Sequence, residues 1–357
     1  MTDWIAKFKI DDILASISKN DAISDIHISA WEYIAFRKNW EIIKYVKLPK
    51  VTEEQIELVV KQLMKWNLKA YEKFISDREA DLSYIAPDWT PYRVNIMFKL
   101  WKMWAVLRKI NAVAMKIEDL TLWDIAQSIK ENVLSKRQWL FLVTWPTGSW
   151  KSTSLVAMID ELNHERPDHI ITIEDPIEFI FTPDKSIISQ REIWHDSWSF
   201  ANALRAAMRE DPDIILVWEI RDKATAEAAL NLAETWHLVF STLHTQSASG
   251  TVNRYISFFP PEIQDSIADR LADSLNWVMS QRLVKRKDGK SRVWVYELMI
   301  NTPAVRNNIK RRQIQQIDNI VETWSKQWMI LLKQYAKRLV NEWITTEDYV
   351  SWILNSN

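Results

Sequence analysis

The sequence of 357 residues lacks several features that would assign it to other classes of protein. It contains no cysteine, which excludes disulfides, cysteine-bound zinc and thiol nucleophiles and fits a reducing compartment. Residues 1–10 include Asp3 and lack the apolar core of a secretory signal peptide. The apolar runs, such as residues 214–218, are far shorter than the ~20 residues that a transmembrane helix needs. We therefore expect a soluble protein of the cytoplasm.

The chain also has no excess of charge of either sign. Its 46 Lys and Arg residues oppose 47 Asp and Glu residues, which leaves a net charge of −1. No global field therefore attracts nucleic acid or an anionic membrane. The basic stretches 282–287 and 310–312 read as a solvated hairpin and a solvated helix face, so we expect no nucleic-acid partner. The length allows two domains.

Glycine is the most unusual absence. The chain has 3 glycines and 21 tryptophans, whereas a globular protein of this length has roughly 25 glycines, because turns and helix ends require positive φ. The two counts add to 24. We interpret most of the tryptophans as glycines encoded by UGA, a codon that the organism reads as glycine. A protein that is truly rich in tryptophan is the alternative, and the codons decide between the two.

The positions of the tryptophans favour the same interpretation. Trp40 follows Asn39 at a place where an Asn-Gly hairpin turn belongs. Trp66, Trp89, Trp236 and Trp343 also lie between expected elements, where glycine suits the backbone better than a large ring.

Residues 1–112 are expected to form an α+β domain. The apolar periodicity predicts a helix over residues 5–18, and Thr52 with Gln55 predicts a capping box at the start of a helix over 52–66. Alternating patterns predict strands over residues 25–29, 33–37, 40–45, 81–85, 92–98 and 104–110. Residues 113–119 are expected to link this domain to the next.

Residues 120–357 read as an α/β domain with a helical tail. Short β-rich runs alternate with helices, which is typical of a mostly parallel sheet with helices on its faces. The expected strands are 140–144, 170–173, 214–217 and 238–242. The expected helices are 152–163, 200–209, 223–234 and 261–278.

A phosphate-binding loop is predicted between the strand at 140–144 and the helix that follows. With Trp145 and Trp150 taken as glycine, the loop reads G-x-x-x-x-G-K-S. Backbone N–H groups would surround the β-phosphate, Lys151 would reach the β- and γ-oxygens, and Ser152 would ligate Mg²⁺. The predicted ATP site comprises Trp145, Pro146, Thr147, Gly148, Ser149, Trp150, Lys151, Ser152 and Thr153.

Acidic residues and a histidine at strand ends complete a predicted hydrolysis site. Glu219 follows the apolar run 214–217, and the carboxyl edge of a parallel sheet lies beside a phosphate loop. It can therefore orient or deprotonate the attacking water. Asp175 and Glu178 follow the run 170–173 and are expected to help hold Mg²⁺. His244 follows the run 238–242 and is expected to contact the γ-phosphate.

These segments, in this order, resemble the ATPases of type II secretion and type IV pili, which belong to the RecA-like P-loop class. The resemblance covers almost the whole chain once tryptophan is read as glycine. The absence of cysteine rules out the zinc insertion of the pilus assembly ATPases, so the chain is most similar to the retraction ATPases. The matching segments are 24–27, 93–95, 174–179, 190–192, 200–205, 209–213, 218–222, 234–237 and 242–245.

The resemblance implies a PAS-like N-terminal domain, a RecA-like second domain and a homo-hexameric ring that hydrolyses ATP with Mg²⁺. It also implies that Arg93 and Arg108 sense phosphate and that His237 lies at the nucleotide. The ring would work at the inner face of the cytoplasmic membrane on a pilus platform protein, and through it on pilin. A related secretion or DNA-uptake motor is an alternative. A nucleotide-binding partner that does not hydrolyse ATP is another, if Trp145 and Trp150 are real.

Overall fold

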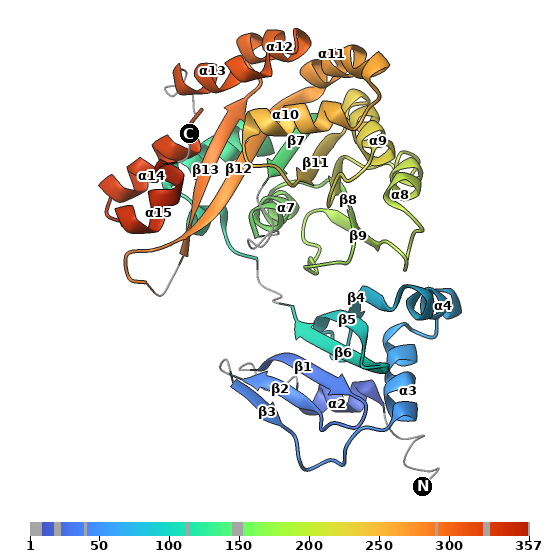
Figure 1. Cartoon of the computed structure of the whole chain (residues 1–357). Coiled ribbons are helices and arrows are strands. Elements are labelled where there is room, and N and C mark those ends of the chain that lie inside the picture. The colour runs from blue at the N-terminus through green and yellow to red at the C-terminus, as the bar shows by residue number, and fades with distance from the viewer. Residues whose placement is uncertain are drawn as a thin grey trace. The chain divides into compact units, whose positions relative to one another are not determined.

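The computed structural model describes residues 9–17, 23–38, 41–110, 114–144, 153–289, 292–323 and 329–355. The chain divides into two compact units (Figure 1), and each is described by itself. The first comprises Met1–Val113, Glu174–Phe181 and Arg191–Trp198. The second comprises Ala114–Ile173, Thr182–Gln190 and Ser199–Asn357.

The first unit contains a six-stranded antiparallel sheet in the order β3-β2-β1-β6-β5-β4. Alternate residues of the strands, such as Ile26, Val94 and Leu107, form one apolar core with buried residues of the helices. The elements are α2 (Ile10–Ile17), β1 (Ile23–Ser29), β2 (Ala35–Lys38), β3 (Glu41–Lys44), α3 (Glu53–Leu63), α4 (Leu68–Asp77), β4 (Glu79–Ile85), β5 (Pro91–Lys99) and β6 (Lys102–Lys109).

Local signals set the helices of this unit. The Thr52 hydroxyl accepts the Gln55 N–H at 3.2 Å, and the Gln55 side chain accepts the Thr52 N–H at 2.9 Å. The predicted capping box of α3 is therefore confirmed. Helix α4 was not predicted, because its cap is a single bond from the Ala70 N–H to Asn67 Oδ1 (3.2 Å) and its sequence is polar.

The second unit contains a seven-stranded sheet in the order β13-β12-β7-β11-β10-β8-β9. Strands β8, β10, β11, β7 and β12 are parallel, and β13 runs antiparallel to β12. The strands are β7 (Trp139–Thr144), β8 (His169–Glu174), β9 (Ile187–Glu192), β10 (Ile214–Val217), β11 (Leu238–Leu243), β12 (Leu275–Lys285) and β13 (Arg292–Ile300). The predicted α/β class is confirmed.

The helices of this unit connect the strands and form the C-terminal part of the chain (Figure 1). They are α5 (Ile117–Leu120), α6 (Trp123–Ile129), η1 (Lys130–Leu134), α7 (Thr153–Glu165), α8 (Phe200–Ala207), α9 (Lys223–Glu234), α10 (Ala248–Ser257), η2 (Pro261–Ile263), α11 (Gln264–Ser274), α12 (Pro303–Lys310), η3 (Ile314–Gln316), α13 (Ile317–Thr323), α14 (Leu332–Asn341) and α15 (Glu347–Leu354).

The predicted helix over residues 261–278 is wrong in its last turn. Helix α11 ends at Ser274, and β12 begins at Leu275. The Asn301 side chain donates to the carbonyl oxygens of Ala272 and Leu275, at 2.7 Å each. These bonds satisfy carbonyls at the end of the helix, while pairing with β13 draws the next residues into the sheet. A long-range partner therefore overrides the local apolar pattern.

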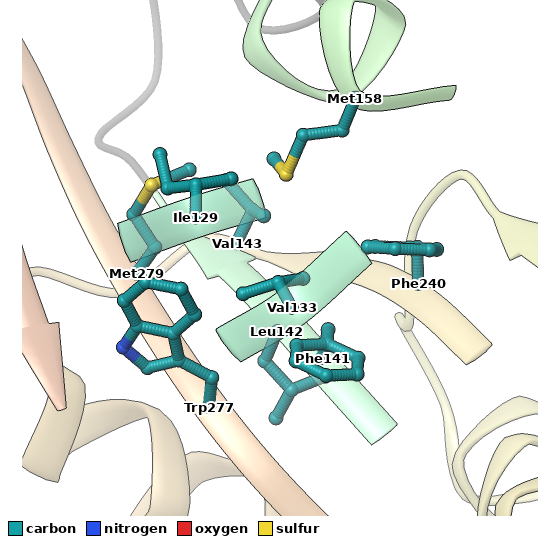
Figure 2. Close-up of a pocket in the computed structure, with 9 residues that line it drawn as sticks. All are labelled: Ile129, Val133, Phe141, Leu142, Val143, Met158, Phe240, Trp277 and Met279. Carbon is teal, nitrogen blue, oxygen red and sulfur yellow. The ribbon is translucent and has the colours of Figure 1, made fainter. Parts of the chain in front are cut away.

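Apolar side chains pack tightly around β7. Figure 2 shows Ile129 and Val133 from α6 and η1 and Met158 from α7 gathered around Val143 of β7 and Met279 of β12. The void that they enclose has a volume of about 10 Å³, close to the smallest that holds one water molecule. This packing fixes the strand and the helix on either side of the expected phosphate loop.

The backbone marks many tryptophans as unusual. Thirteen non-glycine residues in the described ranges have positive φ, and eight of them are tryptophans. A bulky residue with positive φ is an outlier, whereas glycine adopts that conformation freely. All four described positions that the sequence singled out are among the eight; Trp40 lies outside the described residues. The eight are Trp31, Trp66, Trp89, Trp101, Trp139, Trp194, Trp236 and Trp343.

Candidate active site

The strand that precedes the expected phosphate loop is central in its sheet. Strand β7 lies between β11 and β12, runs parallel to both and ends at the buried Thr144. Helix α7 begins at Thr153. The strand and the helix are the flanks that a phosphate loop requires. The residues between them lie outside the described residues: Trp145, Pro146, Thr147, Gly148, Ser149, Trp150, Lys151 and Ser152.

Glu219 and His244 lie together at the carboxyl edge of the parallel strands. Glu219 is 8% exposed. Its Oε2 accepts a hydrogen bond from Arg221 Nη2 at 2.8 Å, and its Oε1 lies 3.2 Å from His244 Nε2. The Ile220 N–H donates to the Thr242 carbonyl at 3.0 Å and ties the segment after β10 to β11. Two residues that the sequence predicted separately thus form one cluster.

This cluster can position a water molecule for attack. The hydrogen bond from Arg221 orients the Glu219 carboxylate, because charge-assisted hydrogen bonds are short and strong. The His244 ring lies beside the other carboxylate oxygen. The hydroxyl of Ser241 donates to the carbonyl of Val217 at 2.8 Å, so β10 and β11 are also joined through a side chain. A fixed carboxylate at a sheet edge can accept a proton from water or orient it toward a phosphate.

The acidic residues after β8 belong to the first unit. Glu174 is fully buried, and its Oε2 accepts the N–H of Glu178 at 3.2 Å. Glu178 Oε1 pairs with Arg93 Nη1 at 2.8 Å. Two predicted site residues therefore contact each other. The N–H of Ile177 donates to the carboxylate of the buried Glu192 at 3.1 Å. This bond anchors the loop between Glu174 and Glu178.

The predicted Mg²⁺ ligands are Ser152, Asp175 and Glu178. Ser152 lies outside the described residues. In the described part of the chain, no three His, Asp or Glu residues are grouped to hold a metal ion. Mg²⁺ bound to a nucleotide needs only one or two carboxylates beside the phosphates, and carboxylate oxygens are the hard ligands that it prefers. The donor chemistry of Asp175 and Glu178 therefore fits the ion.

The structure places His237 away from this edge of the sheet. His237 precedes β11, whereas His244 follows it, so the two histidines lie at opposite ends of one strand. The ring Nδ1 of His237 is 3.0 Å from the Leu232 carbonyl, and its own carbonyl accepts the Trp139 N–H at 3.1 Å. That His237 lies at the nucleotide stays a prediction. Its contacts join the end of α9 to the start of β7.

Two buried polar residues of β12 were missed. Ser280 is opposite Thr144 in the register, so Gln281 and Arg282 extend past the last residue of β7. Gln281 is fully buried, and its amide atoms have no hydrogen-bond partner among the described residues. The expectation of a solvated hairpin over 282–287 is wrong for Arg282, which is 7% exposed and donates to the Gln246 carbonyl at 2.9 Å. Burial lowers the pKa of this guanidinium. The burial of Gln281 and Arg282 follows from the register of β12 against β7, which the sequence does not show.

Comparisons with known proteins add to this geometry. A family model described as "Type II/IV secretion system protein" matches residues 3–325. The chain belongs to this family. It is 38% identical over 339 residues to the type IV pilus retraction ATPase PilT of Pseudomonas aeruginosa, and the match covers 95% of this chain and 96% of that protein. It is 40% identical over 301 residues to a twitching motility protein of Neisseria gonorrhoeae, covering 84% and 79%.

Solved structures of the family are similar over nearly the whole length. A crystal structure of the pilus retraction motor PilT with bound ADP has a TM-score of 0.82 and 36% identity, and covers 98% of this chain and 97% of that one. The ATPase DotB of Legionella pneumophila has a TM-score of 0.84 and 25% identity, covering 96% and 94%. The family expected from the sequence is confirmed. Within the described ranges, no helix combines the length and apolarity needed to cross a membrane.

Proposed function

We propose that this chain hydrolyses ATP and that hydrolysis drives the retraction of type IV pili. The observation that carries the proposal is the buried Glu219 beside His244 and Arg221, at the carboxyl edge of a sheet whose strand β7 precedes the segment Trp150-Lys151-Ser152. That segment is G-K-S when Trp150 is read as glycine. The resemblance to a pilus retraction ATPase over 95% of the chain supports the same function.

Each predicted residue has a chemical role in this proposal. The backbone of residues 145–150 and the start of α7 hold the phosphates, and Lys151 neutralises the β- and γ-oxygens. Glu219 directs water at the γ-phosphate, and His244, which lies beside the Glu219 carboxylate, would contact the same phosphate. Arg93 and Arg108 are the phosphate sensors of the first unit. Guanidinium suits this task because it stays charged and forks onto two oxygens.

Mg²⁺ would enter with the nucleotide, held by Ser152, Asp175 and Glu178. When bound it would neutralise charge on the phosphate oxygens. Glu178 is paired with Arg93 at 2.8 Å in this structure. The carboxylate that is predicted to bind Mg²⁺ therefore already contacts an arginine that is predicted to sense phosphate.

The proposal requires glycine at positions 145 and 150. A Cβ atom at position 150 obstructs the approach of the backbone to phosphate, and an indole obstructs it more. The eight tryptophans with positive φ elsewhere in the chain support the reading of UGA as glycine. A nucleotide-binding partner that does not hydrolyse ATP would follow from tryptophan at these two positions.

The proposed assembly is a homo-hexamer in the cytoplasm, at the inner face of the cytoplasmic membrane. It would act on a pilus platform protein and through it on pilin. Residues 1–112 would form the PAS-like domain and residues 120–357 the RecA-like domain, with 113–119 as the linker. A related secretion or DNA-uptake motor would use the same site.

The test is ATP turnover by the chain made with glycine at the proposed positions. We expect Glu219→Gln to reduce kcat at least about 100-fold while ATP still binds, because the amide cannot take a proton from water. Glu227→Gln, an exposed change on α9, is the matched control and should leave turnover unchanged. Equal turnover by the Glu219→Gln variant and the parent protein would remove the assigned role.

A further inference from the structure

A row of charged side chains crosses one face of the six-stranded sheet. Residues that face each other in the register of neighbouring strands point to the same face. Arg93 of β5 is opposite Arg108 of β6, Arg108 is opposite Asp25 of β1, and Asp25 is opposite Arg37 of β2. Their strand neighbours, such as Ile26 and Leu107, belong to the core on the other face. The polar face thus carries three guanidinium groups and one carboxylate in line.

Asp25 is the buried member of this row. Its side chain is 7% exposed, whereas the side chains of Arg37 and Arg108 are 38% and 71% exposed. Its Oδ1 accepts from Arg108 Nε at 2.7 Å, and its Oδ2 accepts from the Ser24 hydroxyl at 2.7 Å and lies 3.8 Å from Arg37 Nε. Burial alone would raise the pKa of Asp25, but the bonds from Arg108 and Ser24 outweigh it and keep that pKa below its usual value.

The bond from Asp25 uses one particular edge of the Arg108 guanidinium. Nε is the nitrogen nearest the chain, so fixing it sets the direction of the planar group. The two terminal nitrogens, Nη1 and Nη2, have no partner among the residues that the structure describes. They are the forked donors that bind two oxygens of a phosphate. The contact therefore holds the guanidinium in place without using the donors that a phosphate needs.

We propose that Asp25 is a positioning residue for phosphate sensing, which holds Arg108 by Nε so that its terminal nitrogens are presented to the phosphate oxygens of the nucleotide. The inference rests on the proposed function, since it assigns Asp25 to the sensor Arg108. Asp25 itself touches no phosphate.

Asp25→Asn tests this role, because asparagine keeps the shape and an acceptor oxygen but loses the charge. We expect kcat for ATP to fall about tenfold, the range of one charge-assisted hydrogen bond, with the ATP KM within about twofold of the parent protein. Arg108→Ala should lower kcat by a similar factor. The double variant should lose no more than Arg108→Ala alone, because Asp25 acts only through Arg108.

The matched control is Asp81→Asn on the same face of the sheet. Asp81 accepts a cross-strand bond from the Asn95 side chain at 2.8 Å and has no arginine partner in the register. It should leave kcat unchanged. A second variant, Arg108→Lys, keeps the charge and a partner for Asp25, so it protects the fold, but an ammonium group lacks the oriented fork. It should lose activity as Arg108→Ala does.

Three results would overturn the inference. These are a normal kcat in Asp25→Asn, a normal kcat in Arg108→Lys, and losses that multiply in the double variant. The parent protein and Glu219→Gln are measured in parallel. A parent that turns over ATP no faster than Glu219→Gln would refute the proposed function itself and the inference with it. If the parent protein is active and Asp25→Asn is equally active, the inference about Asp25 is refuted and the proposed function is not.

Discussion

A side chain on a residue with positive φ crowds its own carbonyl oxygen, and the cost is roughly 1–2 kcal/mol per residue. Eight tryptophans of this chain have this conformation. Several are also largely exposed, such as Trp89 at 82% and Trp101 at 93%. An exposed ring gains little from packing, so packing does not offset the backbone cost at Trp89 and Trp101. Glycine at these positions removes the cost.

Stability measurements on the chain made with tryptophan can detect this difference. Trp101 has a φ of 69° and is 93% exposed, so Trp101→Gly should raise the free energy of unfolding by about 1 kcal/mol. Trp352 lies inside α15 and is 53% exposed. Trp352→Gly should lower that free energy by about 1 kcal/mol, since glycine is a poor helix former. Thermal denaturation of both variants checks the signs, and a shift of the same sign in both would contradict the account.

The natural protein offers a direct chemical check of the residues themselves. Trypsin cleaves after Arg137 and Lys151, so a single peptide of residues 138–151 contains Trp139, Trp145 and Trp150. We expect mass spectrometry of the protein from its own organism to give the mass for glycine at all three positions. A peptide that carries three indole side chains would show that tryptophan is real there.

At the scale of elements, Glu297 on β13 is an acid in an apolar setting. It is 6% exposed and accepts the Ala248 N–H at 2.6 Å, at the start of α10. Burial raises the pKa of Glu297 to about 7, and the negative charge of Asp318 adds to the effect. The folded protein therefore keeps a proton that the unfolded chain loses at lower pH. This stabilisation is complete below the unfolded pKa of 4.5 and is lost as the pH rises through about 7.

The free energy of unfolding should therefore fall between pH 5 and pH 8, by up to about 3 kcal/mol if this group dominates. Glu297→Gln keeps an acceptor for Ala248 but cannot ionise, so it should flatten this dependence. Glu262→Gln, an exposed change in η2, should leave it as it is. Denaturant titrations at both pH values test the prediction, and an unchanged slope in Glu297→Gln would contradict it.

Local signals in the sequence predicted the elements that they control. The capping box of α3 and the parallel strands β7, β8, β10 and β11 were predicted because caps and apolar runs act over short distances. Helix α4 and the start of β12 were not, because weak caps and a long-range partner decide them. In the site, Glu219 and His244 follow apolar strands and could be found. Asp25 and Gln281 depend on register and burial, which the sequence does not display.

At the scale of the whole molecule, the proposed motor depends on how the chain binds ATP. The loop after β7 would hold the phosphates, and Glu219 would direct water at them. Binding of the phosphates requires a loop free of side chains at position 150 and read as glycine at position 145. The later steps of the proposed motor, phosphate sensing by Arg93 and Arg108 included, depend on that binding.

The most direct test compares ATP turnover by two otherwise identical proteins. Both have glycine at the other proposed positions. One has glycine at 145 and 150, and the other has tryptophan at both. We predict steady turnover that needs Mg²⁺ in the first protein and turnover at background in the second. Equal rates in the two proteins, or no turnover in the first, would contradict the account.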